Sequence, residues 1–139
     1  MAKYLTIAEV MRPNPTLIES VAPVADALSL MRRQAISCLV IPRKDLHDEC
    51  GMLLITDIAR EIVSKNRSIN RTQVYEIMTK PAPSLDAAMT TKYAIRHMER
   101  FALTHSIVVN GRDLVGIVTL KTLVYGYLDV TDNGAAPNK

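Results

Sequence analysis

The sequence predicts a mixed α/β (α+β) fold built from two β-α-β-β-α repeats, and three observations lead to this prediction. Val10 and Met11 recur 67 positions later as Ile77 and Met78. Each half places an amphipathic helical pattern before two β-rich runs. The chain has 139 residues, 48% of them hydrophobic, which suits one globular domain or two small fused ones.

The repeat defines the predicted domain boundaries. The first repeat covers residues 6–64, the polar segment 65–71 ("KNRSINR") links the halves, and the second repeat covers residues 72–129. We expect residues 130–139 to form a mobile tail, because they contain no periodic apolar pattern. A single copy of about 60 residues would have little stability alone. We therefore expect the two repeats to pack through their sheets with pseudo-twofold symmetry.

Each repeat opens with a short apolar helix and a proline-containing extended segment, "TIAEVM" then "RPNPTLIES", and "TQVYEIM" then "TKPAPSLDA". Proline blocks continuation of the helix at these positions. An amphipathic helix follows in each half, with apolar residues at helical spacing. The predicted buried faces are Val24, Ala27, Leu28 and Met31 in the first repeat, and Ile95, Met98, Phe101 and Ala102 in the second.

A β-hairpin and a final helix complete each repeat. The hairpins are "SCLVIP" with "GMLLI" and "HSIVVN" with "LVGIVT", and the helices are "DIAREIVSK" and "TLVYGYLDV". The second hairpin loop is shorter, so the repeat offset falls to 65 and Gly51 corresponds to Gly116. A first hairpin centred on residue 46 pairs Cys38 with Leu54, which keeps Cys38 and Cys50 apart. We expect two free thiols, as in a reducing compartment.

Composition and missing motifs narrow the function. The net charge is +3, with 17 basic residues scattered among 14 acidic ones, which suits a nucleotide as well as a nucleic acid. No apolar run reaches the roughly 20 residues of a membrane span and no leader is visible, so we expect a cytoplasmic protein. No catalytic motif is present, and "HDEC" at residues 47–50 fits a charged turn better than a metal site. The chain is therefore expected to be a binding protein and not an enzyme.

Each repeat ends with a glycine, apolar residues and then Asp or Thr at the start of its last helix. This tandem arrangement resembles the cystathionine-β-synthase (CBS) domain pair, or Bateman module. The resemblance runs from Thr6 to Asp129. It implies a stand-alone regulatory module that binds an adenine nucleotide (AMP, ADP or ATP) or S-adenosylmethionine in a cleft between the repeats. It also implies a homodimer, formed through helices such as "AREIV" and "LVYGYL", and an unidentified partner protein that the module modulates.

The ligand motif of this family is a hydroxyl residue ending the last strand, followed three positions later by an aspartate, both of which contact a ribose. The first copy, "GMLLITD", keeps Asp57 but has Leu54 at the hydroxyl position. The second, "GIVTLKT", keeps Thr119 but has Thr122 at the carboxylate position. The spacing alone also fits a helix capping box, in which both residues would serve only the helix ends.

The resemblance implies which residues would join each motif from the other copy. Asp57 would be joined by Thr104, His105 and Lys121, a set that suits a ribose and a phosphate. Thr119 would be joined by Ser37, Cys38 and Thr56, which supply no charge. We therefore expect one strong site at Asp57 and one weak or empty site at Thr119.

Two alternatives stay open at this point. The pair could be a ligand-free dimerisation scaffold in which both motifs have degenerated. It could also bind nucleic acid, which ranks lowest because only Tyr93, beside Lys92 and Arg96, offers an exposed stacking group near basic residues.

Overall fold

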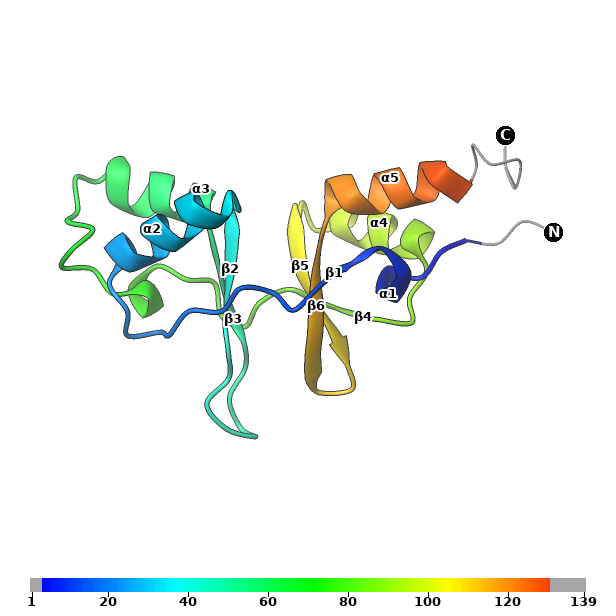
Figure 1. The fold of residues 1–139 in the computed structure, drawn as a ribbon, viewed down its shortest axis with the longest axis horizontal. Helices are drawn as coiled ribbons and strands as arrows, with labels where there is room; N and C mark the ends of the chain where they lie inside the picture. The colour runs from blue at the N-terminus through cyan, green and yellow to red at the C-terminus, as the bar shows by residue number, and fades with distance from the viewer. Residues whose placement is uncertain (1–3, 131–139) are drawn as a thin grey trace. The chain divides into compact units, whose positions relative to one another are not determined.

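The computed structural model describes residues 4–130, which form a mixed α+β fold divided into two compact units (Figure 1). One unit is Thr16–Ala82, called here the 16–82 unit. The other, called here the 83–130 unit, combines residues 83–130 with residues 4–15. The predicted tail at 130–139 lies outside the described residues except for Val130.

The 83–130 unit contains a four-stranded sheet in the order β1-β6-β5-β4. Its strands are β1 (Arg12–Pro13), β4 (Ser84–Asp86), β5 (His105–Asn110) and β6 (Asp113–Thr119). β4 runs parallel to β5 and the other pairs are antiparallel. The helices are α1 (Ile7–Val10), α4 (Thr91–Arg100) and α5 (Leu120–Val130), and α4 packs beside α5 on one side of the sheet (Figure 1).

The 16–82 unit has a similar arrangement around a smaller, two-stranded sheet. Its strands β2 (Cys38–Ile41) and β3 (Gly51–Leu54) form an antiparallel hairpin. Helix α2 (Val24–Gln34) precedes the hairpin, and α3 (Ile55–Ile58) follows it directly and continues as a π-helix, η1 (Ala59–Val63). A 3₁₀ helix, η2 (Val74–Glu76), comes last. Among the described residues of the whole chain, no helix is long and apolar enough to cross a bilayer.

The opening segment of each sequence repeat packs into the unit that holds the other repeat's hairpin. Ile7 is fully buried in the core of the 83–130 unit, together with Met98 and Val118. Val74 is fully buried in the core of the 16–82 unit. The strand pairing follows the same rule, since β1 pairs with β6 and Thr79 forms a bridge with Met52. The sequence repeats and the compact units therefore exchange their first segments.

Gly116 and Gly51 lie where these exchanged segments cross the hairpins. A Cβ added to Gly116 would lie 2.5 Å from Met11 Sδ and 2.9 Å from the Arg12 carbonyl oxygen. A Cβ added to Gly51 would lie 2.9 Å from Met78 Sδ. At Gly116 the crossing backbone and its methionine both occupy the space of a side chain, whereas at Gly51 only the methionine does. The glycine and the methionine that recur in the two repeats therefore contact each other in each unit.

The hairpin register agrees with the sequence-based prediction. Cys38 is paired with Leu54, and both cysteines are free. In α2 the predicted face is confirmed, since Val24, Ala27 and Met31 are buried and Leu28 is half-buried against the same core.

The predicted face of α4 is wrong at its C-terminal end. Phe101 is 56% exposed and Ala102 is also exposed. The helix ends at Arg100, and Ala102 adopts φ 54, so the helical period no longer applies there. The buried residues of the helix are Thr91, Ala94 and Met98.

Alanine substitution at the two crossing glycines should have unequal costs. We expect Gly116→Ala to destabilise the protein by about 1–3 kcal/mol, because a backbone oxygen cannot move aside as readily as a side chain. Gly51→Ala should cost less, and Met78→Ala in the same chain should recover part of that loss. Urea denaturation followed by circular dichroism measures each change.

Gly111→Asn is the control, because Gly111 has φ +66 with no heavy atom within 4 Å of an added Cβ, and asparagine tolerates this backbone region. A Gly116→Ala variant as stable as this control would contradict the proposed contact.

Candidate functional site

Asp57 lies at the joint between β3 and α3, where the strand passes into the helix without a loop. The residue is only 4% exposed. Its Oδ2 accepts a hydrogen bond of 2.8 Å from the Leu54 backbone N–H. This contact is the acidic half of a capping box, so Asp57 stabilises the start of α3 whatever else it does. Leu54 has no side-chain acceptor to supply the other half.

Arg60 covers the second oxygen of Asp57. Its Nη2 lies 2.7 Å from Asp57 Oδ1, and the Arg60 side chain is 61% exposed whereas that of Asp57 is 6% exposed. The hydrogen bond from Arg60 to Asp57 is the main reason that the pKa of Arg60 is raised, with a further contribution from Glu61. A buried carboxylate thus meets a cation at the surface of the unit.

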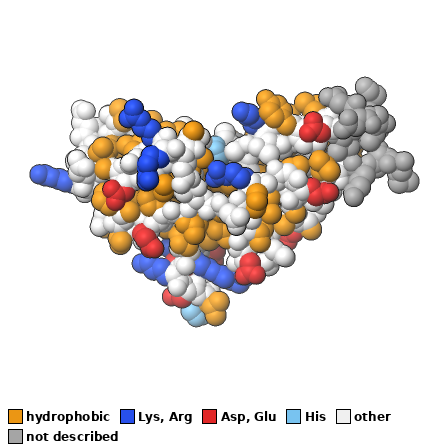
Figure 2. Space-filling view, in the orientation of Figure 1, with side chains coloured by type: hydrophobic (Ala, Val, Ile, Leu, Met, Phe, Trp, Pro, Cys, Tyr) orange, Lys and Arg blue, Asp and Glu red, His pale blue; other side chains and the backbone are white. Residues whose placement is uncertain are grey.

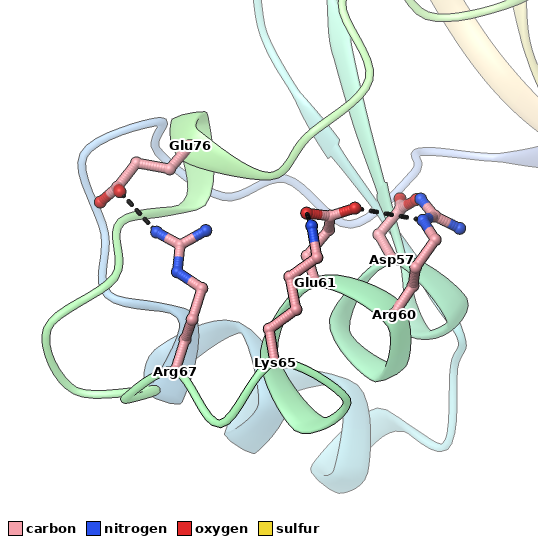
Figure 3. Close-up of polar contacts among 6 residues, drawn as sticks. All are labelled: Asp57, Arg60, Glu61, Lys65, Arg67 and Glu76. Carbon is pink, nitrogen blue, oxygen red and sulfur yellow. Dashed lines mark hydrogen bonds and ion pairs between the residues drawn. The ribbon is translucent and has the colours of Figure 1, made fainter.

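The contact continues along η1 as a short chain of charges (Figure 3). Arg60 Nε lies 3.3 Å from Glu61 Oε2, and Lys65 Nζ lies 2.8 Å from Glu61 Oε1. Lys65 is the main cause of the lowered pKa of Glu61. Sequence reasoning missed Arg60, although the i,i+3 spacing of an acid and an arginine in "DIAR" is a readable signal.

Thr119 plays the complementary capping role at the joint between β6 and α5. Its Oγ1 accepts a hydrogen bond of 3.0 Å from the Thr122 backbone N–H and lies 2.9 Å from Thr122 Oγ1. Thr119 is therefore the hydroxyl half of a capping box, and Thr122 has no carboxylate for the other half. Thr119 therefore caps α5, and its contact with a ligand stays a prediction.

Thr104 and His105 lie beside Thr119 at the same end of the second hairpin. His105 is the register partner of Thr119, and Thr104 Oγ1 lies 2.9 Å from His105 Nδ1. Burial lowers the pKa of His105 from its usual 6.5, so this imidazole is neutral at pH 7. It offers a hydrogen bond and not a charge.

Lys121 provides the positive charge in this part of the 83–130 unit. It is exposed in the first turn of α5, and its Nζ lies 6.0 Å from the ring centroid of Tyr125. The structure thus places Thr104, His105 and Thr119 together and Lys121 two residues further along the chain.

The backbone hydrogen bond at Thr104 has an equivalent at Ser37 in the 16–82 unit. The Ser37 carbonyl accepts a 2.9 Å hydrogen bond from Ile55 N–H, just as the Thr104 carbonyl accepts one of 2.9 Å from Leu120 N–H. Cys38 is buried and Thr56 is exposed. The combination of Asp57 with Thr104, His105 and Lys121 in one binding site stays a prediction.

Comparison with known proteins identifies the repeat. The family model of the CBS domain matches residues 7–64 and again residues 74–129. No curated protein matches the sequence. A hexameric CBS-CP12 protein from bloom-forming cyanobacteria is similar in structure, with a TM-score of 0.84 and 26% identity over 88% of this chain and 72% of that one.

Two more distant structures share the fold. An uncharacterised conserved protein from Pyrococcus horikoshii is 21% identical, with a TM-score of 0.79 over 90% of this chain and 93% of that one. The CBS domain pair of protein MJ0100, in complex with 5′-methylthioadenosine and S-adenosyl-L-methionine, is 20% identical, with a TM-score of 0.75 over 88% of this chain and 95% of that one. Because the CBS model matches both halves, the chain belongs to the CBS domain family and carries two CBS repeats in tandem.

Proposed function

We propose that this CBS pair is a regulatory module that binds an adenine nucleotide or another adenosyl ligand, such as S-adenosylmethionine, and modulates a partner protein. CBS pairs are generally regulatory and not catalytic, and one structural neighbour is a complex with two adenosyl compounds. The observation that carries the proposal is the buried carboxylate of Asp57 at a strand-to-helix joint.

The assigned contacts follow from the donors and acceptors available. A carboxylate has about four lone-pair directions, and Leu54 N–H and Arg60 take one on each oxygen of Asp57. The hydroxyl groups of a ribose would donate to the remaining ones. For a phosphate, Lys121 supplies a charge, while Thr104 and neutral His105 supply hydrogen bonds. Arg60 adds a second cation, which the sequence-based hypothesis did not include.

Asp57→Asn should abolish the stabilisation of the protein by its adenosyl ligand. A thermal-shift panel of AMP, ADP, ATP, NAD and S-adenosylmethionine identifies that ligand, because about 100 times the dissociation constant stabilises by roughly 2.7 kcal/mol. Isothermal titration then measures the affinity of the variant, and Lys121→Ala should weaken phosphate-bearing ligands more than uncharged adenosine.

Glu76→Gln is the matched control. Glu76 also accepts from the backbone N–H three residues earlier, at 2.9 Å from Gln73, and also pairs with an arginine, Arg67, at 2.7 Å (Figure 3). This variant should lose similar structural contacts and keep ligand affinity. Equal loss of affinity in both variants, or no shift with any compound, would reject the proposal.

The lowered pKa of His105 predicts a pH dependence of stability. As pH falls through about 6.5, the unfolded chain takes up a proton at this histidine before the folded chain does. The free energy of unfolding should therefore decrease with acidification until the lower folded pKa is passed, and His105→Gln should remove that part of the slope. An NMR titration of the imidazole checks the cause, since a midpoint at or above 6.5 would contradict it.

The proposal includes self-association into a homodimer. Large apolar side chains are exposed on the helices, including Val63 at 69%, Tyr125 at 59% and Leu128 at 44%. These are residues of the two helical segments named for the homodimer, and one structural neighbour is hexameric. A scaffold without a ligand would use the same surfaces.

One specific observation favours nucleic-acid binding as a second candidate function. Phe101, at 56% exposed, lies 5.7 Å from the guanidinium of Arg100, which adds a second stacking group to Tyr93 on α4. Arg96 lies 5.5 Å from the Tyr93 ring. However, acidic and basic side chains are interspersed on the face drawn in Figure 2, which weakens the case for an extended basic surface.

For this second candidate, Tyr93→Ala and Phe101→Ala should each weaken binding of a single-stranded oligonucleotide by about 1–3 kcal/mol. Electrophoretic retardation at rising salt measures the effect, because phosphate contacts lose affinity as salt increases. Tyr75→Ala, which removes a tyrosine that is 51% exposed in the 16–82 unit, is the control. Retardation that is unchanged by all three variants would exclude this surface.

A further inference from the structure

A cavity of about 370 Å³ lies within the 16–82 unit, apart from the residues assigned to the adenosyl ligand. None of Asp57, Ser37, Cys38 and Thr56 lines it. The cavity is lined by Ser20, Val21, Lys44, Tyr75, Met78 and Lys80. These residues come from three separate stretches of the chain, so only the folded unit brings them together.

Two hydrogen bonds hold two walls of the cavity in place. The Tyr75 N–H donates to the Ser20 carbonyl at 2.9 Å. The Gln73 side-chain amide donates to the Val21 carbonyl at 3.2 Å. These bonds join η2 to the segment that precedes α2, so the cavity exists before any ligand arrives.

One carboxylate, that of Asp48, holds both lysine residues at the cavity. Its Oδ1 lies 2.6 Å from Lys80 Nζ, and its Oδ2 accepts from the Lys44 backbone N–H at 2.9 Å. The contact with Lys80 is the main reason that the pKa of Asp48 falls to about 2, so the acid is ionised at neutral pH. The charged residues that line the cavity are both lysines, and only Lys80 is paired with Asp48 through its ammonium group.

Apart from the half-buried Ser20, the rest of the lining is apolar and partly open to solvent. Val21 is 60% exposed and Tyr75 is 51% exposed, and Met78 is half-buried beside them. Exposed apolar side chains next to ammonium groups match a ligand with an apolar body and an anionic end. The volume falls within the range of about 300–1,000 Å³ usual for small-molecule sites.

We propose that this cavity is a second ligand site, which binds a small organic anion consisting of a carboxylate or a phosphate monoester attached to an aromatic or aliphatic body. Lys44 and Lys80 bind the oxyanion, and Val21, Tyr75 and Met78 contact the body. The site is independent of the adenosyl ligand, because it shares no residue with that assignment.

Isothermal titration with four probes tests the proposal. Phenyl phosphate and phenylacetate carry both features, inorganic phosphate carries only the charge, and benzyl alcohol carries only the apolar ring. At least one of the two aryl anions should bind at least tenfold more tightly than inorganic phosphate and benzyl alcohol. The tighter of the two identifies the preferred oxyanion. Failure of both aryl anions to bind, or equal binding of all four probes, would overturn the proposal.

Variants locate the binding. Lys44→Ala and Lys80→Ala together should weaken the better aryl anion at least tenfold, and Tyr75→Ala should also weaken it. Lys65→Ala is the control, since Lys65 pairs with an acid at 2.8 Å in the same unit but does not line the cavity. Equal weakening by the control would overturn the assignment. Adenosyl binding, measured in parallel, should be unchanged, which separates failure of this site from failure at Asp57.

Discussion

The crossing of each exchanged segment over a hairpin glycine is the contact on which the rest of the structure depends. Thr79 and Met52 exchange two backbone hydrogen bonds of 2.9 Å beside Gly51. This pairing anchors β3 from the side opposite β2, and α3 begins at the residue after β3 ends. The position of Asp57 is therefore set by a segment more than twenty residues later in the chain. A side chain at the crossing would displace that segment first and the site with it.

Helix capping explains why each repeat keeps only one of the two residues of the ligand motif. The first copy keeps the acidic half of a capping box, with Asp57 accepting from Leu54 N–H, and the second keeps the hydroxyl half, with Thr119 accepting from Thr122 N–H. Each helix start needs a partner for its free N–H groups, and one half already supplies it. Each copy can therefore lose the other half without leaving its helix uncapped. What differs is the charge, since only Asp57 offers a carboxylate.

Much of the fold could be predicted from local patterns, whereas the long-range features could not. The repeat and the pairing of Cys38 with Leu54 follow from spacing alone, and both are observed. Packing of Ile7 with the second hairpin has no local signal, because it joins residues far apart in the sequence. For the candidate site, the sequence placed Asp57 and Thr119 at the correct joints. It did not indicate the π-helix that follows Asp57, because a single wide turn leaves no clear periodicity.

The pair of Asp57 and Arg60 suggests how a ligand at this carboxylate would act on the surface. The guanidinium is mostly exposed and the carboxylate is buried, so moving Arg60 costs little while leaving Asp57 without a partner costs much more. A ribose that donates to Asp57 beside Arg60 shares the carboxylate with the arginine and changes its contact, and Arg60 also contacts Glu61, the partner of Lys65. The change would then spread along η1, which carries the exposed Val63. A ligand shifts an equilibrium only through contacts that differ between two states, and this rearrangement supplies such a difference within a single unit.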